Sequence, residues 1–417
     1  MAWADSAVRW RWSGGWRRVV HRLPCRAFRA SDRRCTLAGM DISLPSVKTP
    51  TDVLAVVPYL LGFTPERSIV VIAMRDRRVV FQARADLPAL DEIAAVAGHL
   101  ATVVARQRVD SALIVAYGAD ADVRPTVEVL RESLEERQVT VSDALRADGG
   151  RYWSYVCRRP DCCPLTGTPY DVASTTLAAA ATYAGLSPAA SRGELEARLA
   201  PVGGLARIAM RAASERAERR LSALIEEAGQ RVPVAARPQS AGDSATEMEC
   251  ANLARAAVYD AGVRAVDEAN ACIGAIAPLD DEALAWLALL LVSVPVRDYA
   301  WERVDRDVEG SVDLWTDIVR RVEPDLVAAP ATLLAFAAWR NGGGAIASIA
   351  LDRALDADPA YPMARLLLDA IDNGLAPSAW LDVPPPGSPR PVRRRRQRRH
   401  GQRSPRARAV PPGRTIR

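Results

Sequence analysis

Three of the chain's seven cysteines, Cys157, Cys162 and Cys163, lie in one short segment, "RYWSYVCRRPDCCP" at 151–164. Their spacing is C-x4-C-C. Zinc in proteins takes four nitrogen or sulfur ligands in a tetrahedron, often with two cysteines a few residues apart. The trio is therefore a candidate metal site, with zinc as the candidate cofactor. A fourth ligand could come from Asp161, Asp171, Cys250, Cys272 or water.

Two other interpretations of the trio remain open. Arg158 and Arg159 would lower the pKa of a neighbouring thiol, so Cys157 could form a redox pair with Cys162 or Cys163. Free cysteine is also among the most buried residue types, so the thiols could pack beneath Tyr152, Trp153 and Tyr155. Successive side chains on extended backbone point apart, which argues against two adjacent cysteines binding one ion.

A second candidate site is acidic. Asp86, Asp120 and Asp122 follow predicted strands, and ligands of open α/β sheets gather at the carboxyl ends of strands. Three carboxylates could bind Mg²⁺. Aspartate also favours turns and helix N-caps, and Asp122 stands where an N-cap is expected. The preference for turns and caps would explain the three aspartates without a bound ion.

Motifs of common enzyme classes are missing from the sequence. No Walker A glycine–lysine pattern is present, and the single lysine, Lys48, lies in another context. His99 is the only histidine in residues 41–389, so a Ser-His-Asp or Cys-His mechanism has one possible base. The sequence therefore disfavours conventional hydrolase chemistry.

Charge is concentrated at the two ends. The net charge is +5, but residues 1–40 carry +7 and residues 390–417 carry +12, which leaves −14 for the remainder. Such an arginine run predicts a disordered tail that binds polyanions such as nucleic acid without sequence specificity. The candidate polyanion-binding residues are Arg393, Arg394, Arg395, Arg396, Arg398 and Arg399.

Strand and helix patterns alternate in the first half of the body. "TPTD" predicts a helix with Thr49 as N-cap that ends near Gly62. Gly149–Gly150 predicts a hairpin turn. Further strands are predicted at 68–74, 78–88 and 110–117, with helices at 90–106 and 122–137. This alternation is typical of an α/β domain with a mixed sheet and flanking helices.

Strand patterns nearly vanish after Pro169, and the rest predicts an α-helical domain of stacked hairpins. Residues 232–245 predict a flexible connector. The longest apolar run, 283–296, is shorter than the about 20 residues of a membrane span, so a buried core helix is expected. Because no signal peptide is recognised either, a cytoplasmic protein without a membrane segment is expected.

The domain organisation follows from these patterns. Residues 1–39 predict an unstructured basic head, and Met40 is the predicted true start of the chain. Residues 40–169 then form the α/β domain with its cysteine-rich loop. Residues 170–381 form the helical domain, and 382–417 the disordered tail rich in Arg and Pro.

Several motifs agree in order with one known family: "LPSVKTPTDVLAVVPYLLGFTPERSIVVIAM", "RADLP", "GRYWSYVCRRPDCCPLTGTPY", "SRGELEARLAP" and "AIASIALDRALDADPAYPMARLLLDAIDNGLAP". Over roughly residues 41–381 the chain resembles the domain of unknown function 4192 family of uncharacterised actinobacterial proteins. The resemblance implies an actinobacterial cytosolic protein with a family-typical cysteine cluster. It implies no activity.

The absence of catalytic patterns beside a helical second half predicts a non-enzymatic interaction or regulatory protein. Its helical half would contact a protein partner or a second copy of the chain. The alternative is a metal- or thiol-dependent enzyme centred on Cys157, Cys162 and Cys163. A further alternative is non-specific nucleic-acid binding through the arginine-rich tail.

Overall fold

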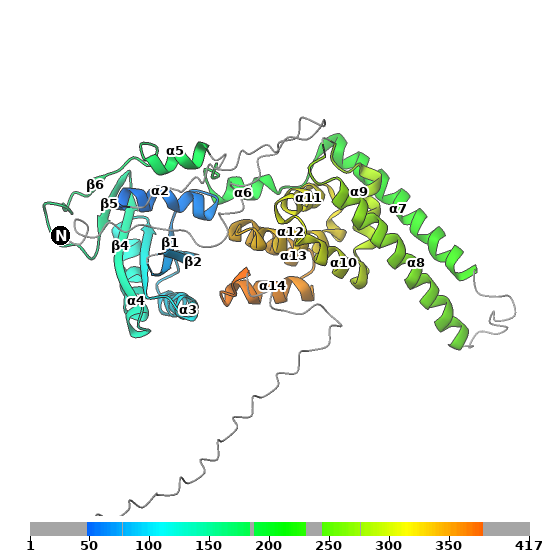
Figure 1. Ribbon diagram of the computed structural model, residues 1–417, viewed down its shortest axis with the longest axis horizontal. Helices are drawn as coiled ribbons and strands as arrows, with labels where there is room; N and C mark the ends of the chain where they lie inside the picture. Colours follow the sequence, from blue (N-terminus) through cyan, green and yellow to red (C-terminus); the bar gives the residue numbers. More distant parts are fainter. Residues whose placement is uncertain (1–47, 77, 184–186, 231–243, 276, 378–417) are drawn as a thin grey trace, which may run out of the picture. The chain divides into compact units, whose positions relative to one another are not determined.

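The computed structural model describes residues 48–76, 78–183, 187–230, 244–275 and 277–377 (Figure 1). The predicted basic head, the start at Met40, most of the predicted connector and the arginine-rich tail lie outside these residues, so the corresponding predictions stay predictions.

The first described helix, α2 (Pro50–Leu61), begins as its sequence predicts. Thr49 Oγ1 accepts the backbone N–H of Asp52 at 3.1 Å, and Asp52 Oδ2 accepts the backbone N–H of Thr49 at 3.0 Å. This reciprocal capping box satisfies N–H groups that the first turn leaves without partners. The helix ends at Gly62, whose φ of 82° lies in the left-handed region that glycine tolerates best.

The sheet has six strands in the order β2-β1-β3-β4-β5-β6. Strand β1 is antiparallel to both β2 and β3, whereas β3 and β4 are parallel, so the predicted mixed sheet is confirmed. The strands are β1 (Ser68–Arg75), β2 (Arg78–Asp86), β3 (Ser111–Tyr117), β4 (Thr140–Asp148), β5 (Arg151–Ser154) and β6 (Thr168–Pro169).

Helices cover both faces of this sheet (Figure 1). Side chains alternate between the faces along each strand, so Val71 and Ile114 pack with α3 (Ile93–Arg106) and α4 (Asp120–Glu136). Val70 and Val115 pack on the opposite face with α2 and Leu177 of α5 (Thr176–Tyr183). Because both faces are covered, β1 and β3 are apolar along most of their length.

The hairpin between β4 and β5 turns at Gly149 and Gly150, with φ of 53° and 74°. Two successive positive φ values match the type I′ turn that suits the twist of antiparallel strands. The turn sets the register, which pairs Leu145 with Ser154 and Arg146 with Trp153. The cysteine-rich loop begins directly after β5.

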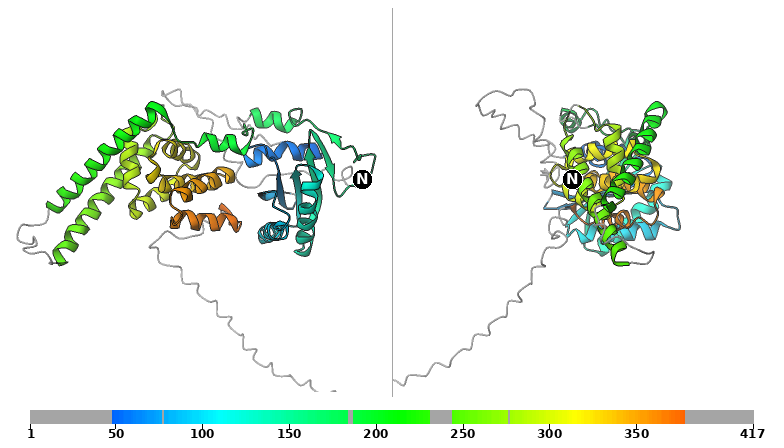
Figure 2. Two further views of the ribbon diagram at one scale, coloured as in Figure 1. Left: turned by 180° about the vertical axis from the view of Figure 1, so that it is seen from behind. Right: turned by 90° about the vertical axis from the view of Figure 1, so that its right-hand side faces the viewer.

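The remainder of the described chain is helical, as predicted. Its α-helices are α6 (Arg192–Arg198), α7 (Gly204–Gln230), α8 (Ser244–Ala271), α9 (Asp281–Leu290), α10 (Val294–Val304), α11 (Val308–Arg321), α12 (Ala328–Arg340), α13 (Gly344–Ala357) and α14 (Pro362–Asp372). The two longest, α7 and α8, lie side by side as an antiparallel pair (Figures 1 and 2).

The apolar run 283–296 is two helices, not the single core helix expected. Helix α9 ends at Leu290, and Pro295 occupies the first turn of α10. Proline is well tolerated there because a first-turn N–H has no intrahelical acceptor to lose. In the described residues, no single helix is both long and apolar enough to cross a bilayer, although α9 and α10 together, bent by 115°, pass on length and composition.

Candidate metal centre

The loop that carries the cysteines starts from a buried carboxylate. Asp143 lies in β4 with 2% of its surface exposed, and its Oδ1 accepts the hydroxyl of Ser154 at 2.7 Å. Ser154 Oγ in turn accepts the backbone N–H groups of Val156 at 3.2 Å and Cys157 at 2.9 Å. This chain of hydrogen bonds bends the backbone after β5 and positions Cys157 at the beginning of the loop.

The other two cysteines stand on a tight turn. The backbone N–H groups of Cys162 and Cys163 both donate to the carbonyl oxygen of Arg159, at 3.2 and 2.8 Å. The expectation that adjacent cysteines point apart is therefore wrong here. It assumed extended backbone, whereas the turn rotates successive side chains toward the same side.

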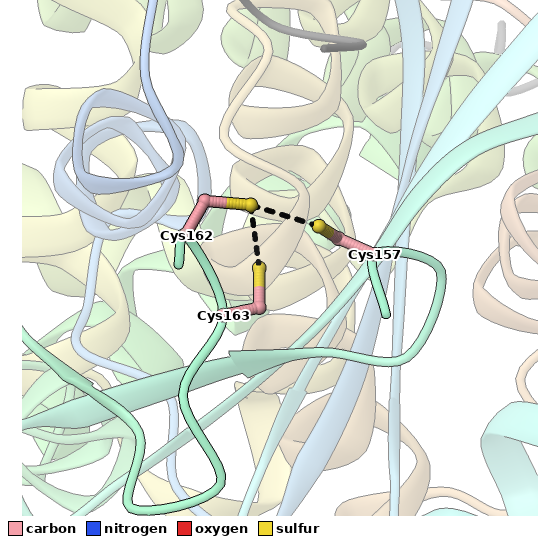
Figure 3. Close-up of side chains that lie close together, drawn as sticks. All are labelled: Cys157, Cys162 and Cys163. Atoms are coloured by element: carbon pink, nitrogen blue, oxygen red, sulfur yellow. Dashed lines mark hydrogen bonds between the residues drawn. The ribbon is translucent and has the colours of Figure 1, made fainter. Parts of the chain in front are cut away.

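The three sulfur atoms converge (Figure 3). Cys157 Sγ lies 3.0 Å from Cys162 Sγ, which lies 3.7 Å from Cys163 Sγ, and all three sulfurs are within 4.8 Å of one another. With Zn–S bonds of about 2.3 Å, two thiolates on one tetrahedral ion are ~3.8 Å apart. The distance between the sulfurs of Cys162 and Cys163 matches this value, whereas Cys157 lies closer to Cys162 than two thiolates on one ion would. The trio can therefore hold one thiolate-bound ion once the sulfur of Cys157 moves away from Cys162 by about 0.8 Å.

The cysteines lie at the surface and not in the core. Cys162 is exposed, whereas Cys157 and Cys163 are half-buried, and all three are free thiols. The expectation of buried thiols beneath the aromatic residues is therefore wrong. A hydrogen bond from Cys162 lowers the pKa of Cys157, while burial raises the pKa of Cys163 to about 12. Cys157 is thus the first of the two to become the thiolate that binds metal.

No fourth protein ligand joins the trio within the described residues. Asp161, Asp171, Cys250 and Cys272, the side chains that the sequence offered for this role, all belong to the described part of the chain and lie outside the group. Of the five candidates for the fourth ligand, water is the one that these positions leave.

The far end of the loop is anchored on Trp153. Its indole Nε1 donates to the carbonyl oxygen of Leu165 at 3.0 Å. Gly167, with a φ of 77°, approaches the ring so closely that an added Cβ would lie 2.4 Å from Cε2. The guanidinium of Arg146 covers the indole at 3.6 Å, a cation–π contact. Both ends of the loop are therefore attached to β4 and β5.

Asp143 and Ser154 were not singled out in the sequence. A usable signal was present, because aspartate is depleted in strands and "VSDALRAD" places Asp143 inside a strand, next to Ala144 and Leu145. A buried carboxylate needs hydrogen-bond donors, so its position marks a polar network.

The three aspartates of the candidate acidic site are each engaged by a different arginine. Asp86 pairs with Arg84, and Asp122 with Arg67 at 3.3 Å. Asp120 accepts Arg124 Nε at 2.9 Å and the Tyr155 hydroxyl at 2.8 Å. Among the described residues, the cysteine trio is the group of potential ligands that converges on a point, and these carboxylates are not part of it. The arginines Arg393, Arg394, Arg395, Arg396, Arg398 and Arg399 lie outside the described residues.

Comparison with known families places the chain in a family. The profile of the domain of unknown function family DUF4192 matches residues 50–378, so the chain belongs to that family. No curated protein and no solved structure matches the chain.

Proposed function

We propose that this DUF4192 protein is a metal-binding protein whose residues Cys157, Cys162 and Cys163 hold one zinc ion. The observation that supports the proposal is the convergence of the three sulfurs to within 4.8 Å of one another. Three such donors on a surface loop select a thiophilic ion such as zinc over Mg²⁺ or Ca²⁺, which prefer oxygen.

The ion would stabilise the loop in its observed conformation. Metal binding is coupled to folding wherever the ligands come from separate parts of a flexible segment. Here Cys157 lies shortly after β5, which ends at Ser154, and the other two lie on the turn at Arg159. A bound ion would tie the two together, so that the surface of the loop becomes available to a partner in one conformation.

Native mass spectrometry of the reduced, anaerobically purified protein tests this proposal. The expected result is one zinc per chain in the wild type and loss of that zinc in Cys157→Ser. Cys250→Ser is the matched control, because Cys250 is a half-buried cysteine of α8 outside the trio. A zinc-free wild type after reconstitution, or an unchanged zinc content in Cys157→Ser, would overturn the proposal.

A second function is favoured by the exposed apolar side chains of α7 and α8. Leu205 and Ile208 stand one helical turn apart on α7 and are 84% and 66% exposed, and Met248 of α8 is 60% exposed. Side chains of this size on the surface support a role in binding a protein partner or a second copy of the chain. The wild type should then show a stoichiometric partner in native lysate, or a dimer mass by light scattering. Leu205→Ser/Ile208→Ser should show neither.

The expected compartment agrees with the proposed zinc site. The protein would act in the cytoplasm of an actinobacterium, where thiols stay reduced and available to metal.

Binding of nucleic acid by the arginine-rich tail is a third proposed function, supported by the charge of +12 on residues 390–417. Deletion of residues 390–417 should then abolish a salt-dependent affinity for nucleic acid, and unchanged affinity would exclude the tail.

A further inference from the structure

The cysteine trio supplies three corners of a tetrahedron. The 3.7 Å between the sulfurs of Cys162 and Cys163 is close to the ~3.8 Å edge of a tetrahedral zinc–thiolate site. Structural zinc sites close all four corners with protein ligands, whereas sites that act on ligands leave one corner to water or substrate. The identity of the fourth donor therefore decides which kind of site this is.

The described residues around the trio have other roles. The nearby carboxylate of Asp143 directs Oδ1 to the Ser154 hydroxyl and to the backbone N–H of Ala144, at 2.7 and 2.8 Å. It thereby holds the backbone of the loop, and it does not belong to the converging group. Asp161 is exposed within the loop itself and is also outside the group.

Solvent reaches the centre. Cys162 is exposed, Cys157 and Cys163 are half-buried, and the sulfur of Cys162 contacts both of the others. An ion bound between the three sulfurs would therefore lie next to water on the side of Cys162.

We infer that the fourth coordination position of this centre is open and is filled from outside the chain, by water that a thiolate-bearing small molecule replaces. The inference rests on the proposed zinc site. A thiolate is the matching class because soft ligands favour the thiophilic ions that a three-sulfur site selects. In the exchange the incoming thiol loses its proton to buffer, its sulfur bonds to the metal, and the water leaves.

Cobalt substitution tests the open position directly. The full-length protein is loaded with one equivalent of Co²⁺ in a phosphine reductant without thiols. A near-ultraviolet sulfur-to-cobalt charge-transfer band should report binding by the trio, and the visible d–d bands the coordination geometry. Titration with 2-mercaptoethanol should shift the d–d bands saturably and reversibly, while acetate should leave them unchanged. Cys157→Ser should lose the charge-transfer band and the shift.

The outcomes separate the two proposals. If the charge-transfer band is present but 2-mercaptoethanol does not shift the d–d bands, the fourth donor belongs to the protein. That result overturns the open position but supports the metal site. Loss of both bands with release of cobalt also overturns it, because the thiol then competes for the metal. Absence of any charge-transfer band overturns the metal site and the open position together.

Discussion

Ser154 donates a hydrogen bond to the buried carboxylate of Asp143, with 2.7 Å between Ser154 Oγ and Asp143 Oδ1. The same hydroxyl oxygen accepts the backbone N–H of Cys157 at 2.9 Å. A group in the interior of the sheet is in this way linked to the first cysteine of a surface loop. Mutation of groups that orient metal ligands typically lowers metal affinity by about 10- to 100-fold.

Removal of that hydroxyl is the first prediction. Ser154→Ala should weaken zinc binding about 10-fold, because Cys157 is then less firmly positioned. It should also lower the free energy of unfolding by about 1–3 kcal/mol, since Asp143 Oδ1 loses a buried donor. Competition titration with a chromophoric chelator and chemical denaturation measure the two quantities.

Ser222→Ala is the matched control, because the Ser222 hydroxyl donates to the backbone carbonyl oxygen of Glu218 on the exposed side of α7. It should change stability by less than about 0.5 kcal/mol and leave zinc affinity unchanged. Equal zinc affinities for Ser154→Ala and the wild type would show that Ser154 does not orient the site.

The second prediction concerns the close approach of Gly167 to Trp153. Gly167→Ala should lower the free energy of unfolding by about 3 kcal/mol, because positive φ and a clash with the indole both oppose the new Cβ. Gly149→Ala shares the positive φ but has open space, so it should cost only ~1–2 kcal/mol. Chemical denaturation of both variants measures the difference, and equal costs would remove Trp153 from the explanation.

The third prediction is a pH dependence at Asp120. Burial acts to raise its pKa, but hydrogen bonds from Tyr155 and Arg124 outweigh that effect and hold the pKa below its ordinary value. The native state therefore favours the ionised carboxylate. This contribution is fully present above the ordinary aspartate pKa of about 4 and is lost as the pH falls through the lower native value.

Asp120→Asn tests this dependence. The wild type should be more stable than the variant at neutral pH, and the difference in free energy of unfolding should shrink as the pH falls below about 4. Asp122→Asn is the control, because Asp122 pairs with Arg67 in an exposed ion pair of little energetic value. Denaturation curves of the wild type and both variants across this pH range measure the difference. A difference that grows on acidification would contradict the lowered pKa of Asp120 in the native state.

The fourth prediction is the effect of metal removal. Zinc at 100 times its dissociation constant should stabilise the native state by about 2.7 kcal/mol, and a chelator should remove this gain. Removal should also speed tryptic cleavage after Arg158, which is exposed in the loop. Thermal melts and mass spectrometry of the peptide ending at Arg158 measure the two effects. Cys157→Ser should not respond to the chelator, and a response equal to that of the wild type would place the zinc elsewhere.

Local signals in the sequence were sufficient for much of the fold. Thr49 and Asp52 define the start of α2 because a capping box involves only neighbouring residues. Gly149 and Gly150 define the hairpin because few other residues adopt two successive positive φ values. The single helix expected over 283–296 was wrong because Pro295 begins a new helix there, and proline in a helix interior would cost an intrahelical hydrogen bond.

For the metal centre, the amino-acid sequence by itself determined the donors and their spacing. The tertiary structure decided that the sulfurs of Cys162 and Cys163 point to the same side, because a hydrogen-bonded turn replaces the extended backbone. It also decided that Asp143 orients Cys157 through Ser154. These contacts depend on the register of β4 with β5, which brings Asp143 beside Ser154, and on the path of the loop that follows β5. The loop is held by contacts with the strands, such as the bond from Trp153 to Leu165, which no pattern of neighbouring residue types encodes.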